Sequence, residues 1–268
     1  MPLAVCATPI GNLEDVTLRV LRELREADVV LCEDTRHTRV LLERHGLRAR
    51  LLSYHAHNEA ERVAQLLPRL AEERVALVSD AGLPGVNDPG ARLVDAALDA
   101  GIPVTVLPGP SAVETALVAS GLRAERYRFL GFLPRRAAEL AALLDELRAW
   151  PDAVVAFESP RRLPASLARV AAAFPERPVA VCRELTKRFE EVVRGPAADV
   201  AARFADPPKG EITLILGPEP GAAAGPGDAA ALAALEELVA GGCSRRTAAT
   251  VVARLTGASR KQLYDASL

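Results

Sequence analysis

A group of chemically reactive side chains directly follows an apolar run near the start of the chain. The run VVLC (29–32) is followed at once by Glu33, Asp34, Thr35 and Arg36. Carboxylates can accept protons, and a guanidinium can bind an anion or pair with a carboxylate. This stretch therefore either delivers chemistry at the end of a strand or begins a helix with Asp34 or Thr35 as its N-cap. The two interpretations are compatible.

Loops rich in polar residues, glycine and proline follow the other apolar runs in the same way. Glycine allows close approach of the backbone to a ligand and proline stiffens the chain, so such loops suit ligand binding without reorganisation. Ligands of open α/β sheets bind at the carboxyl ends of the strands, so we expect these loops to gather at one sheet edge. The loops are TPIGNLED (8–15), EDTRHTR (33–39), SDAGLPGVNDPG (79–90), PGPSAV (108–113), ESPRR (158–162) and RELTKRFEE (183–191), and KGEIT (209–213) precedes the last run.

The apolar runs alternate with segments of helical periodicity, which predicts how these loops are positioned. Such alternation is typical of an α/β fold with mostly parallel strands and helices on both sheet faces. Strands are expected at 3–8, 29–32, 75–79, 104–107, 127–133, 153–157, 179–184 and 212–217, and helices at 16–27, 91–100, 136–149 and 163–173.

The chain divides into two α/β lobes, a linker and a helical tail. The pattern is interrupted near residues 115–122, so we predict lobes at 1–117 and 118–217. The Pro/Gly/Ala stretch 218–228 has no periodicity and predicts a linker. Three short helical patterns fill 229–268, where the segment 243–261 carries five cations and no acid. This tail is typical of a helix-turn-helix element that contacts phosphates, with dimer packing or disorder as the alternative.

Composition and missing motifs exclude several classes of protein. The 268 residues carry a net charge of −2, so any contact with nucleic acid must come from a local basic patch. The four cysteines are scattered without a C-x-x-C pair, which gives a zinc site little support. No P-loop is present, and the string GPGDAA (225–230) lies in the linker without a preceding strand. Without a membrane-length apolar run or a signal peptide, we expect a cytoplasmic protein.

Taken together, the loops resemble one family closely. In chain order they read T-P-I-G-N-L-x-D, E-D-T-R, S-D-A-G-x-P-x-x-x-D-P-G, P-G-P-S-A, F-L-P-R, F-E-S-P-R-R, R-E-L-T-K-x-x-E and K-G-E. This set resembles the ribosomal RNA small subunit methyltransferase I family of the tetrapyrrole methylase superfamily, from residue 8 to about residue 217. The tail resembles the C-terminal helical extension of that family.

The resemblance implies a fold, a cofactor and a reaction. The implied fold has two α/β lobes with mostly parallel or mixed sheets, and S-adenosylmethionine (SAM) binds in the cleft between them. The implied reaction is methylation of the ribose 2′-hydroxyl of a cytidine in the decoding region of 16S rRNA, within the small ribosomal subunit. The resemblance further implies a homodimer. From the cysteine spacing and the length of the apolar runs, we expect neither a metal nor a membrane partner.

The resemblance also assigns cofactor-binding residues, position by position. The loop after the third apolar run would hold the methionine part of SAM, and the second lobe would recognise adenine through backbone groups. In the loop after the third apolar run, S-D-A (79–81) stands where the superfamily's tetrapyrrole members commonly have G-D-P, and this difference favours the ribosomal branch. The assigned residues are Pro9, Val78, Ser79, Asp80, Leu83, Ser111, Ala112, Glu158, Leu185, Gly210, Glu211, Ile212 and Thr213.

Methyl transfer to a hydroxyl requires alignment and a proton acceptor. Asp34 or Glu33 could accept the ribose proton, and burial would raise the pKa of that carboxyl toward a useful value. Arg36 could hold an RNA phosphate or pair with the carboxylate. Lys187 and Glu184 are alternative bases.

Paired cations flank the implied cleft and continue into the tail. They are expected to contact RNA phosphates: Arg135, Arg136, Arg161, Arg162, Arg188, Arg245, Arg246 and Lys261. Two alternatives stay open. One is a methyltransferase of the same superfamily that acts on a tetrapyrrole or another small substrate. The other is a non-catalytic ribosome-assembly factor, which predicts that the chain binds no SAM.

Overall fold

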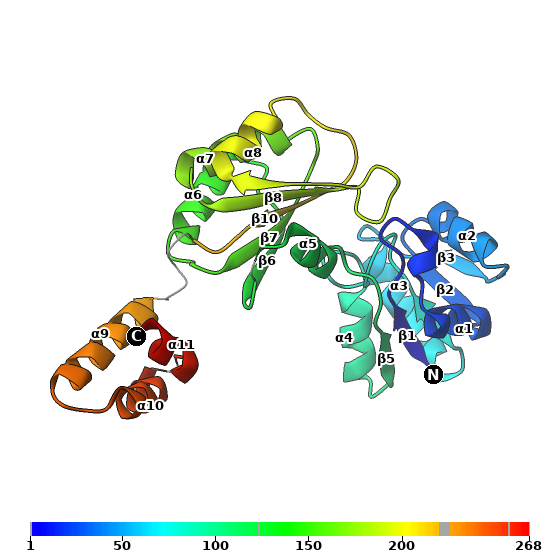
Figure 1. The fold of residues 1–268 in the computed structure, drawn as a ribbon. Coiled ribbons are helices and arrows are strands. Elements are labelled where there is room, and N and C mark those ends of the chain that lie inside the picture. The colour runs from blue at the N-terminus through cyan, green and yellow to red at the C-terminus, as the bar shows by residue number, and fades with distance from the viewer. Residues whose placement is uncertain (1, 123, 220–225, 257, 268) are drawn as a thin grey trace.

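The computed structural model describes residues 2–122, 124–219, 226–256 and 258–267. The N-terminal lobe contains a sheet in the order β3 (Leu51–Ser53), β2 (Val29–Cys32), β4 (Val75–Leu77), β1 (Leu3–Cys6), β5 (Val104–Leu107) (Figure 1). All neighbouring strands of this sheet are parallel, as the alternating pattern predicts. Their carboxyl ends therefore lie at one edge.

Alternate residues of the first sheet face two separate hydrophobic clusters. Ala4, Val30 and Ala76 belong to one cluster, and Leu3, Val29 and Val75 belong to the other. The first cluster is completed by helices α1 (Leu18–Glu26) and α2 (Thr35–Arg44). A short 3-10 helix, η1 (Leu13–Asp15), precedes α1 in the chain. The second is completed by α3 (Glu59–Leu66), η2 (Leu67–Ala71) and α4 (Ala91–Asp99). A parallel sheet buried on both faces explains why its strands are almost wholly apolar.

The second sheet is mixed. Its order is β6 (Tyr127–Phe132), β7 (Ala153–Glu158), β10 (Ile212–Leu216), β8 (Pro178–Arg183), β9 (Glu191–Pro196). β6 and β7 are parallel, whereas β10 is antiparallel to both of its neighbours and β8 is antiparallel to β9. The expectation that six loops share one sheet edge is wrong, because the last two of those loops follow strands of this second sheet.

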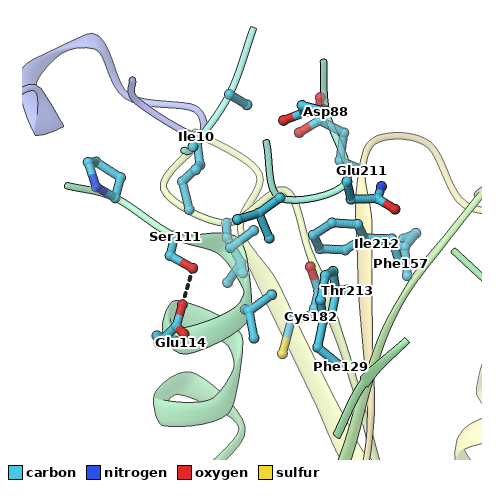
Figure 2. A pocket seen from close by; sticks show the side chains of 18 of the residues that line it. Ile10, Asp88, Ser111, Glu114, Phe129, Phe157, Cys182, Glu211, Ile212 and Thr213 are labelled. Atoms are coloured by element: carbon cyan, nitrogen blue, oxygen red, sulfur yellow. Dashed lines mark hydrogen bonds between the residues drawn. The ribbon is translucent and has the colours of Figure 1, made fainter. Parts of the chain in front are cut away.

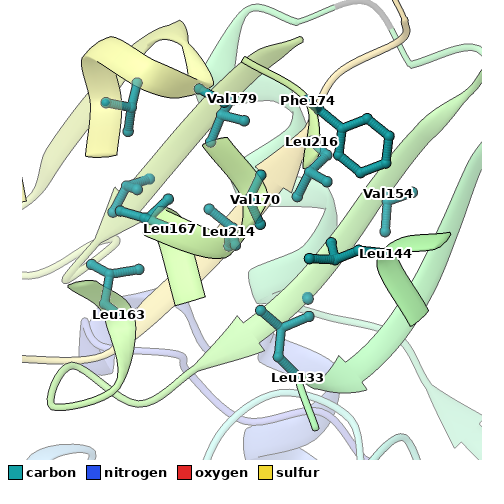
Figure 3. Close-up of a cluster of buried hydrophobic side chains, with 14 of the residues drawn as sticks. Leu133, Leu144, Val154, Leu163, Leu167, Val170, Phe174, Val179, Leu214 and Leu216 are labelled. Atoms are coloured by element: carbon teal, nitrogen blue, oxygen red, sulfur yellow. The ribbon is translucent and has the colours of Figure 1, made fainter. Parts of the chain in front are cut away.

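The second sheet also buries both faces. One face packs against α6 (Ala137–Leu147), α7 (Leu163–Ala173) and α8 (Ala197–Arg203) through a cluster that includes Leu144, Leu167 and Leu214 (Figure 3). The other face, through Val155, Ala180 and Ile215, packs against α5 (Ala112–Ser120).

Helix α5 connects the lobes and contains the boundary predicted after residue 117. Val113, Ala116 and Leu117 of this helix pack on the second sheet together with Ile10 from the first lobe. The helix ends at Gly121, whose left-handed φ of 64° favours glycine. By its contacts, α5 lies with the second sheet although its N-terminus follows a loop of the first.

The tail consists of α9 (Pro226–Ala240), α10 (Arg245–Thr256) and α11 (Arg260–Ala266). These helices share their own core, which includes Leu235, Val252 and Leu263. Ser244 and Ser259 accept hydrogen bonds from Thr247 and Gln262, as expected for N-caps. Helix α9 begins within the predicted linker. Residues 220–225 of that linker, and Gly257 between α10 and α11, lie outside the described residues.

Most of the predicted strands and helices are confirmed, and most of the missed ones are short or polar; the exception is α5, an apolar helix in the segment where the pattern was expected to be interrupted. β3, β9, α3 and α8 have only partly buried or mixed sequences, so their periodicity is weak. Among the helices of the described residues, none is both long and apolar enough to cross a membrane.

Candidate active site

A cavity of about 670 Å³ lies between the two lobes and is lined by loops from both. Figure 2 shows side chains from loops of the first lobe, from α5 and from the second lobe around it. The first lobe contributes Ile10, Asp80–Leu83, Val86–Asp88 and Pro108–Ser111, α5 contributes Ala112–Glu114, and the second lobe contributes Tyr127, Phe129, Phe132, Phe157–Pro160, Cys182, Leu185 and Gly210–Thr213. Loops that follow strands of different sheets thus converge on one cavity.

The first-lobe side is held by bonds between neighbouring strand ends. Backbone hydrogen bonds join Thr8 and Gly82 in both directions, at 2.8 and 3.1 Å, and the Thr8 hydroxyl donates to the Ser79 carbonyl at 3.0 Å. Gly109 lies so close to the loop after β1 that a Cβ atom there would approach the Ala7 Cβ to 2.9 Å. These contacts fix the loops after β1, β4 and β5 against one another.

The second-lobe side meets the first lobe at Gly11. A Cβ atom at this position would lie 2.7 Å from the carbonyl oxygen of Leu185, so only glycine allows the contact. Glu184, with a left-handed φ of 52°, accepts a hydrogen bond from the Glu211 N–H at 3.0 Å. That bond ties the loop after β8 to the segment that precedes β10, and so shapes one wall of the cavity.

Glu158 at the end of β7 is a buried carboxylate with a full set of partners. It accepts hydrogen bonds from Ser166 Oγ at 2.5 Å and from the Ser159 N–H at 2.6 Å, and it pairs with Arg162 at 2.5 Å. Arg162 also donates to the carbonyls of Leu133 and Pro134. This network fixes the turn between β7 and α7 at the cavity wall.

Three carboxylates gather where β2 and β4 end. Burial, together with the charges of Glu33 and Asp80, raises the pKa of Asp88 to about 6, although a hydrogen bond from Ser79 opposes the shift. Burial and the charge of Asp80 also raise the pKa of Glu33. Asp80 and Asp88 line the cavity, and Asp80 accepts a hydrogen bond from the Asp34 N–H at 3.1 Å. Asp88 is therefore a half-buried carboxyl that can change its protonation state near neutral pH.

Asp34 is the N-cap of α2 and is paired with Arg36. It accepts the Arg36 N–H at 2.8 Å, and the guanidinium binds its two oxygens at 2.6 to 3.2 Å. These hydrogen bonds hold the pKa of Asp34 well below its usual range. The expectation that burial raises this pKa is wrong, because the side chain remains 33% exposed and has a cation as its partner. Such a carboxylate is a weak base.

Lys187 is held between two acids, Glu184 at 3.0 Å and Glu211 at 2.9 Å. Burial lowers the pKa of Lys187, but its hydrogen bonds to these carboxylates outweigh that effect and the net shift is upward. The hydrogen bond from the Glu211 N–H and the pairing with Lys187 lower the pKa of Glu184. A protonated lysine and a stabilised carboxylate are both poorly suited to accept a proton. Lys187 and Glu184 instead connect the loop after β8 to Glu211, which lines the cavity.

Most of the residues assigned to the cofactor from the sequence line the cavity. These are Asp80, Leu83, Ser111, Ala112, Glu158, Leu185, Gly210, Glu211, Ile212 and Thr213. Pro9, Val78 and Ser79 lie behind this lining and are buried. The four proposed catalytic residues, Glu33, Asp34, Arg36 and Lys187, are also outside the lining described here.

Sequence reasoning missed Asp88 and the aromatic side of the cavity, formed by Tyr127, Phe129, Phe132 and Phe157. Ser111 does not cap α5 through its side chain, and its hydroxyl donates to Glu114 instead (Figure 2). Glu114 also accepts a hydrogen bond from Tyr127. Asp88 lies in the loop 79–90, but the sequence alone does not show which acid of that loop faces the cavity.

The proposed RNA-binding cations are mostly exposed, with one exception. Arg135, Arg161, Arg188 and Arg246 are exposed, and Arg136 is exposed beside Glu139. Arg162 instead turns inward to Glu158. In the tail, a hollow is lined by Arg246, Arg260 and Lys261 together with Ala249, Tyr264 and the acid Asp265. Arg245 donates to the Ser267 carbonyl. Within the described part of the chain, no group of three or more His, Cys, Asp or Glu side chains is arranged so that it could hold a metal ion.

Two family patterns match the chain. Residues 2–201 match the pattern of the tetrapyrrole (corrin/porphyrin) methylases, and residues 225–268 match a C-terminal helix-turn-helix domain named after RsmI. Curated relatives called ribosomal RNA small subunit methyltransferase I are similar to this chain, and some of them match almost its whole length. The protein of Mesorhizobium japonicum is 46% identical over 98% of this chain and 90% of its own, and that of Mycobacterium bovis is 45% identical over 99% and 94%.

Solved structures share the two-lobed fold. Uroporphyrin-III-C-methyltransferase from Thermus thermophilus aligns with a TM-score of 0.57 and 26% identity over 80% of this chain and 93% of its own. The methyltransferase CobJ aligns with a TM-score of 0.62 and 20% identity over 81% and 93%. Another structure of the Thermus thermophilus enzyme, which is complexed with S-adenyl homocysteine, has a TM-score of 0.56 and 23% identity over 80% and 96%.

Proposed function

Because the chain belongs to the tetrapyrrole methylase family, and within it to the ribosomal RNA small subunit methyltransferases I, we propose that it methylates 16S rRNA with SAM as the methyl donor. The proposed target is the ribose 2′-hydroxyl of a cytidine in the decoding region. The observation that carries the proposal is the cavity between the lobes, with a half-buried carboxyl beside an apolar wall.

The chemistry of the cavity lining fits SAM. Ile10, Leu185 and Ile212 give apolar surface for an adenine ring, and the backbone of Gly210–Thr213 offers polar groups next to it. Asp80, Asp88 and Glu211 place negative charge where a cationic ligand gains from it. When bound, SAM supplies an electrophilic methyl group on a positively charged sulfur.

Asp88 is the residue we assign as proton acceptor. It lines the cavity, and its raised pKa of about 6 lies closer to the working pH than that of an ordinary aspartate. A carboxylate oxygen of Asp88 would take the proton from the ribose hydroxyl. The electron pair of the hydroxyl oxygen would then be free to attack the methyl group that SAM would supply. Glu33 and Asp80 would act indirectly, since their charges raise the basicity of Asp88. Arg36 keeps a positioning role through its pairing with Asp34.

Small ribosomal subunits that lack the modification test the proposal. We expect the purified protein and methyl-labelled SAM to label 16S rRNA, and nuclease digestion to yield 2′-O-methylcytidine. Labelling of a porphyrinoid instead of the subunit would support the small-substrate alternative. An absence of SAM binding in calorimetry would support the non-catalytic assembly factor.

The tail is the part we propose to hold the rRNA. A chain that ends at residue 221 should bind small subunits at least 10-fold more weakly, because it loses the cations of α10 and α11. Its affinity for SAM should be unchanged, because the cavity is lined only by residues of the two lobes among those the structure describes. Filter binding and calorimetry measure the two affinities, and equal subunit affinity with and without the tail contradicts the assignment.

A charge variant of the tail gives a sharper version of this experiment. Arg246 and Lys261 line one hollow, whereas Arg254 is exposed elsewhere on α10. We expect the double change Arg246→Ala and Lys261→Ala to weaken subunit binding and to reduce its salt dependence, and Arg254→Ala to do so less. Equal effects of the two variants would mean that the hollow has no special role.

A homodimer in the cytoplasm completes the proposal. β5 is an edge strand of the first sheet, and its Val106 is 51% exposed, which leaves apolar surface for a second copy. Light scattering coupled to gel filtration should give the mass of two chains, and a single-chain mass at micromolar concentration would count against the dimer.

A further inference from the structure

Phe132 occupies an unusual position at the mouth of the cavity. Its side chain lines the cavity and is 57% exposed, although it stands at the end of a strand in a well-packed sheet. Val86 from the first lobe also lines the cavity and is 51% exposed. The opening therefore presents apolar surface from both lobes, which a bound molecule could cover.

An irregularity in β6 turns Phe132 toward the cavity. Phe129 pairs with Val155, and Phe132 pairs with Phe157, so β6 uses three steps where β7 uses two. One extra residue on β6 is a β-bulge, and a bulge reverses the direction of the side chain that follows it. Phe129 and Phe132 consequently share a face and both contact Phe157 edge-on, with ring centroids 5.1 and 5.6 Å apart. Without the bulge, Phe132 would point toward α6 and α7, as Leu133 does.

The bulge depends on Gly131, which also contacts the first lobe. Its φ of +66° is a conformation that favours glycine, and a Cβ atom there would lie 2.6 Å from Asn87 Oδ1. Asn87 directly precedes Asp88, so the strand end that carries Phe132 lies against the loop that carries the proposed proton acceptor. The ring is thereby placed near the reacting end of the cavity.

We propose that Phe132 is the platform on which the base of the target nucleotide stacks. This rests on the proposed function, since a ribose hydroxyl can reach Asp88 only if its nucleotide leaves the surrounding RNA. Unstacked bases in single-stranded RNA are commonly held on aromatic side chains. A platform next to the Asp88 loop would hold the base while the attached ribose faces the carboxylate. Ile212 lies on β10, which is separated from the β6 strand of Phe132 by β7. The backbone near Ile212 is therefore left free to bind the adenine of SAM.

Substitutions of Phe132 test the proposal in the full-length protein. Phe132→Ala should lower kcat/KM for small subunits roughly 10- to 100-fold, the range expected for loss of one stacked base. Phe132→Tyr and Phe132→Trp should keep most of the activity, whereas Phe132→Leu should resemble alanine, because leucine is apolar but offers no ring. Affinity for SAM and the melting temperature should stay within error, and Leu18→Ala, an exposed apolar change away from the cavity, is the control.

Each outcome decides the matter. A loss of SAM affinity in Phe132→Ala that matches the loss of activity would assign the ring to adenine and overturn the proposal. Unchanged kcat/KM, or full activity in Phe132→Leu, would overturn it as well. If the unaltered protein does not methylate rRNA, the proposed function fails and this inference fails with it; the other two results leave that function standing.

Discussion

Replacement of Asp88 by asparagine should reduce methyl transfer to small subunits about 10²- to 10³-fold while the affinity for SAM is retained. Asparagine keeps the size of the side chain but cannot accept the ribose proton, and general-base catalysis is commonly worth about 10²- to 10⁴-fold. The fold should not suffer, because a half-buried charge among like charges is removed. Single-turnover kinetics with labelled SAM measure the rate, and thermal melting checks the fold.

The matched control is Asp34→Asn. Asparagine is also a good N-cap, so α2 should be preserved, and the rate should fall no more than a few-fold, because the pKa of Asp34 is held low by Arg36. If Asp34→Asn abolishes transfer and Asp88→Asn does not, the proton goes to the carboxylate at the start of α2 and the assignment to Asp88 is wrong.

The same residue predicts the pH dependence of the reaction. The deprotonated form of Asp88 is the active one, and its pKa is raised to about 6. The rate should therefore rise with pH, about 10-fold per unit, up to about pH 6 and level off above it. Since Glu33 and Asp80 contribute to the raised pKa, Glu33→Gln should move this midpoint to lower pH. A profile whose midpoint is the same in Glu33→Gln would mean that another group titrates.

The neighbouring arginines 161 and 162 should behave very differently when each is replaced by alanine. Arg162→Ala leaves the buried Glu158 carboxylate without its cation. Removing one partner of a buried pair is strongly destabilising, and we expect a cost of about 3 kcal/mol, at the low end of the usual range because Arg162 is partly exposed. That corresponds to a melting temperature lower by roughly 6–12 °C.

Arg161→Ala should leave the melting temperature nearly unchanged, because this side chain is exposed. Glu158→Gln in the Arg162→Ala background should recover part of the lost stability, since it removes the unpaired charge. Calorimetric melting of the four proteins measures these differences. If Arg162→Ala melts like Arg161→Ala and both weaken subunit binding equally, Arg162 serves the RNA and not the fold.

The difference between these two arginines illustrates what the sequence could predict. The apolar runs predicted the strands of the two sheets, because such strands must be buried. The loops that follow them predicted most of the cavity, because ligands of α/β sheets bind at the carboxyl ends of the strands. Two adjacent arginines look alike as letters, however, and only the packing of α7 on β7 decides which one turns toward Glu158. Arg162 lies only four residues from Glu158, but its other two acceptors, the carbonyls of Leu133 and Pro134, come from the chain that follows β6.

The acidic and aromatic sides of the cavity show the same limit. The pKa of Asp88 depends on Glu33, which comes from the end of another strand. Periodicity predicts that β6 exists but not that its alternation breaks at Gly131. A glycine inside a strand pattern is a known sign of a bulge, so this signal was present in the letters YRFLGF. Its consequence for Phe132 required the pairing with β7.

We propose that the cavity between the lobes holds SAM with its methyl group at the Asp88 loop. A crystal structure of the protein grown with S-adenosylhomocysteine tests it most directly. We expect the ligand to fill the cavity, with its adenine along Gly210–Thr213 and its sulfur facing the Asp80–Asp88 loop. A ligand bound elsewhere, or one whose sulfur lies away from Asp88, would contradict it.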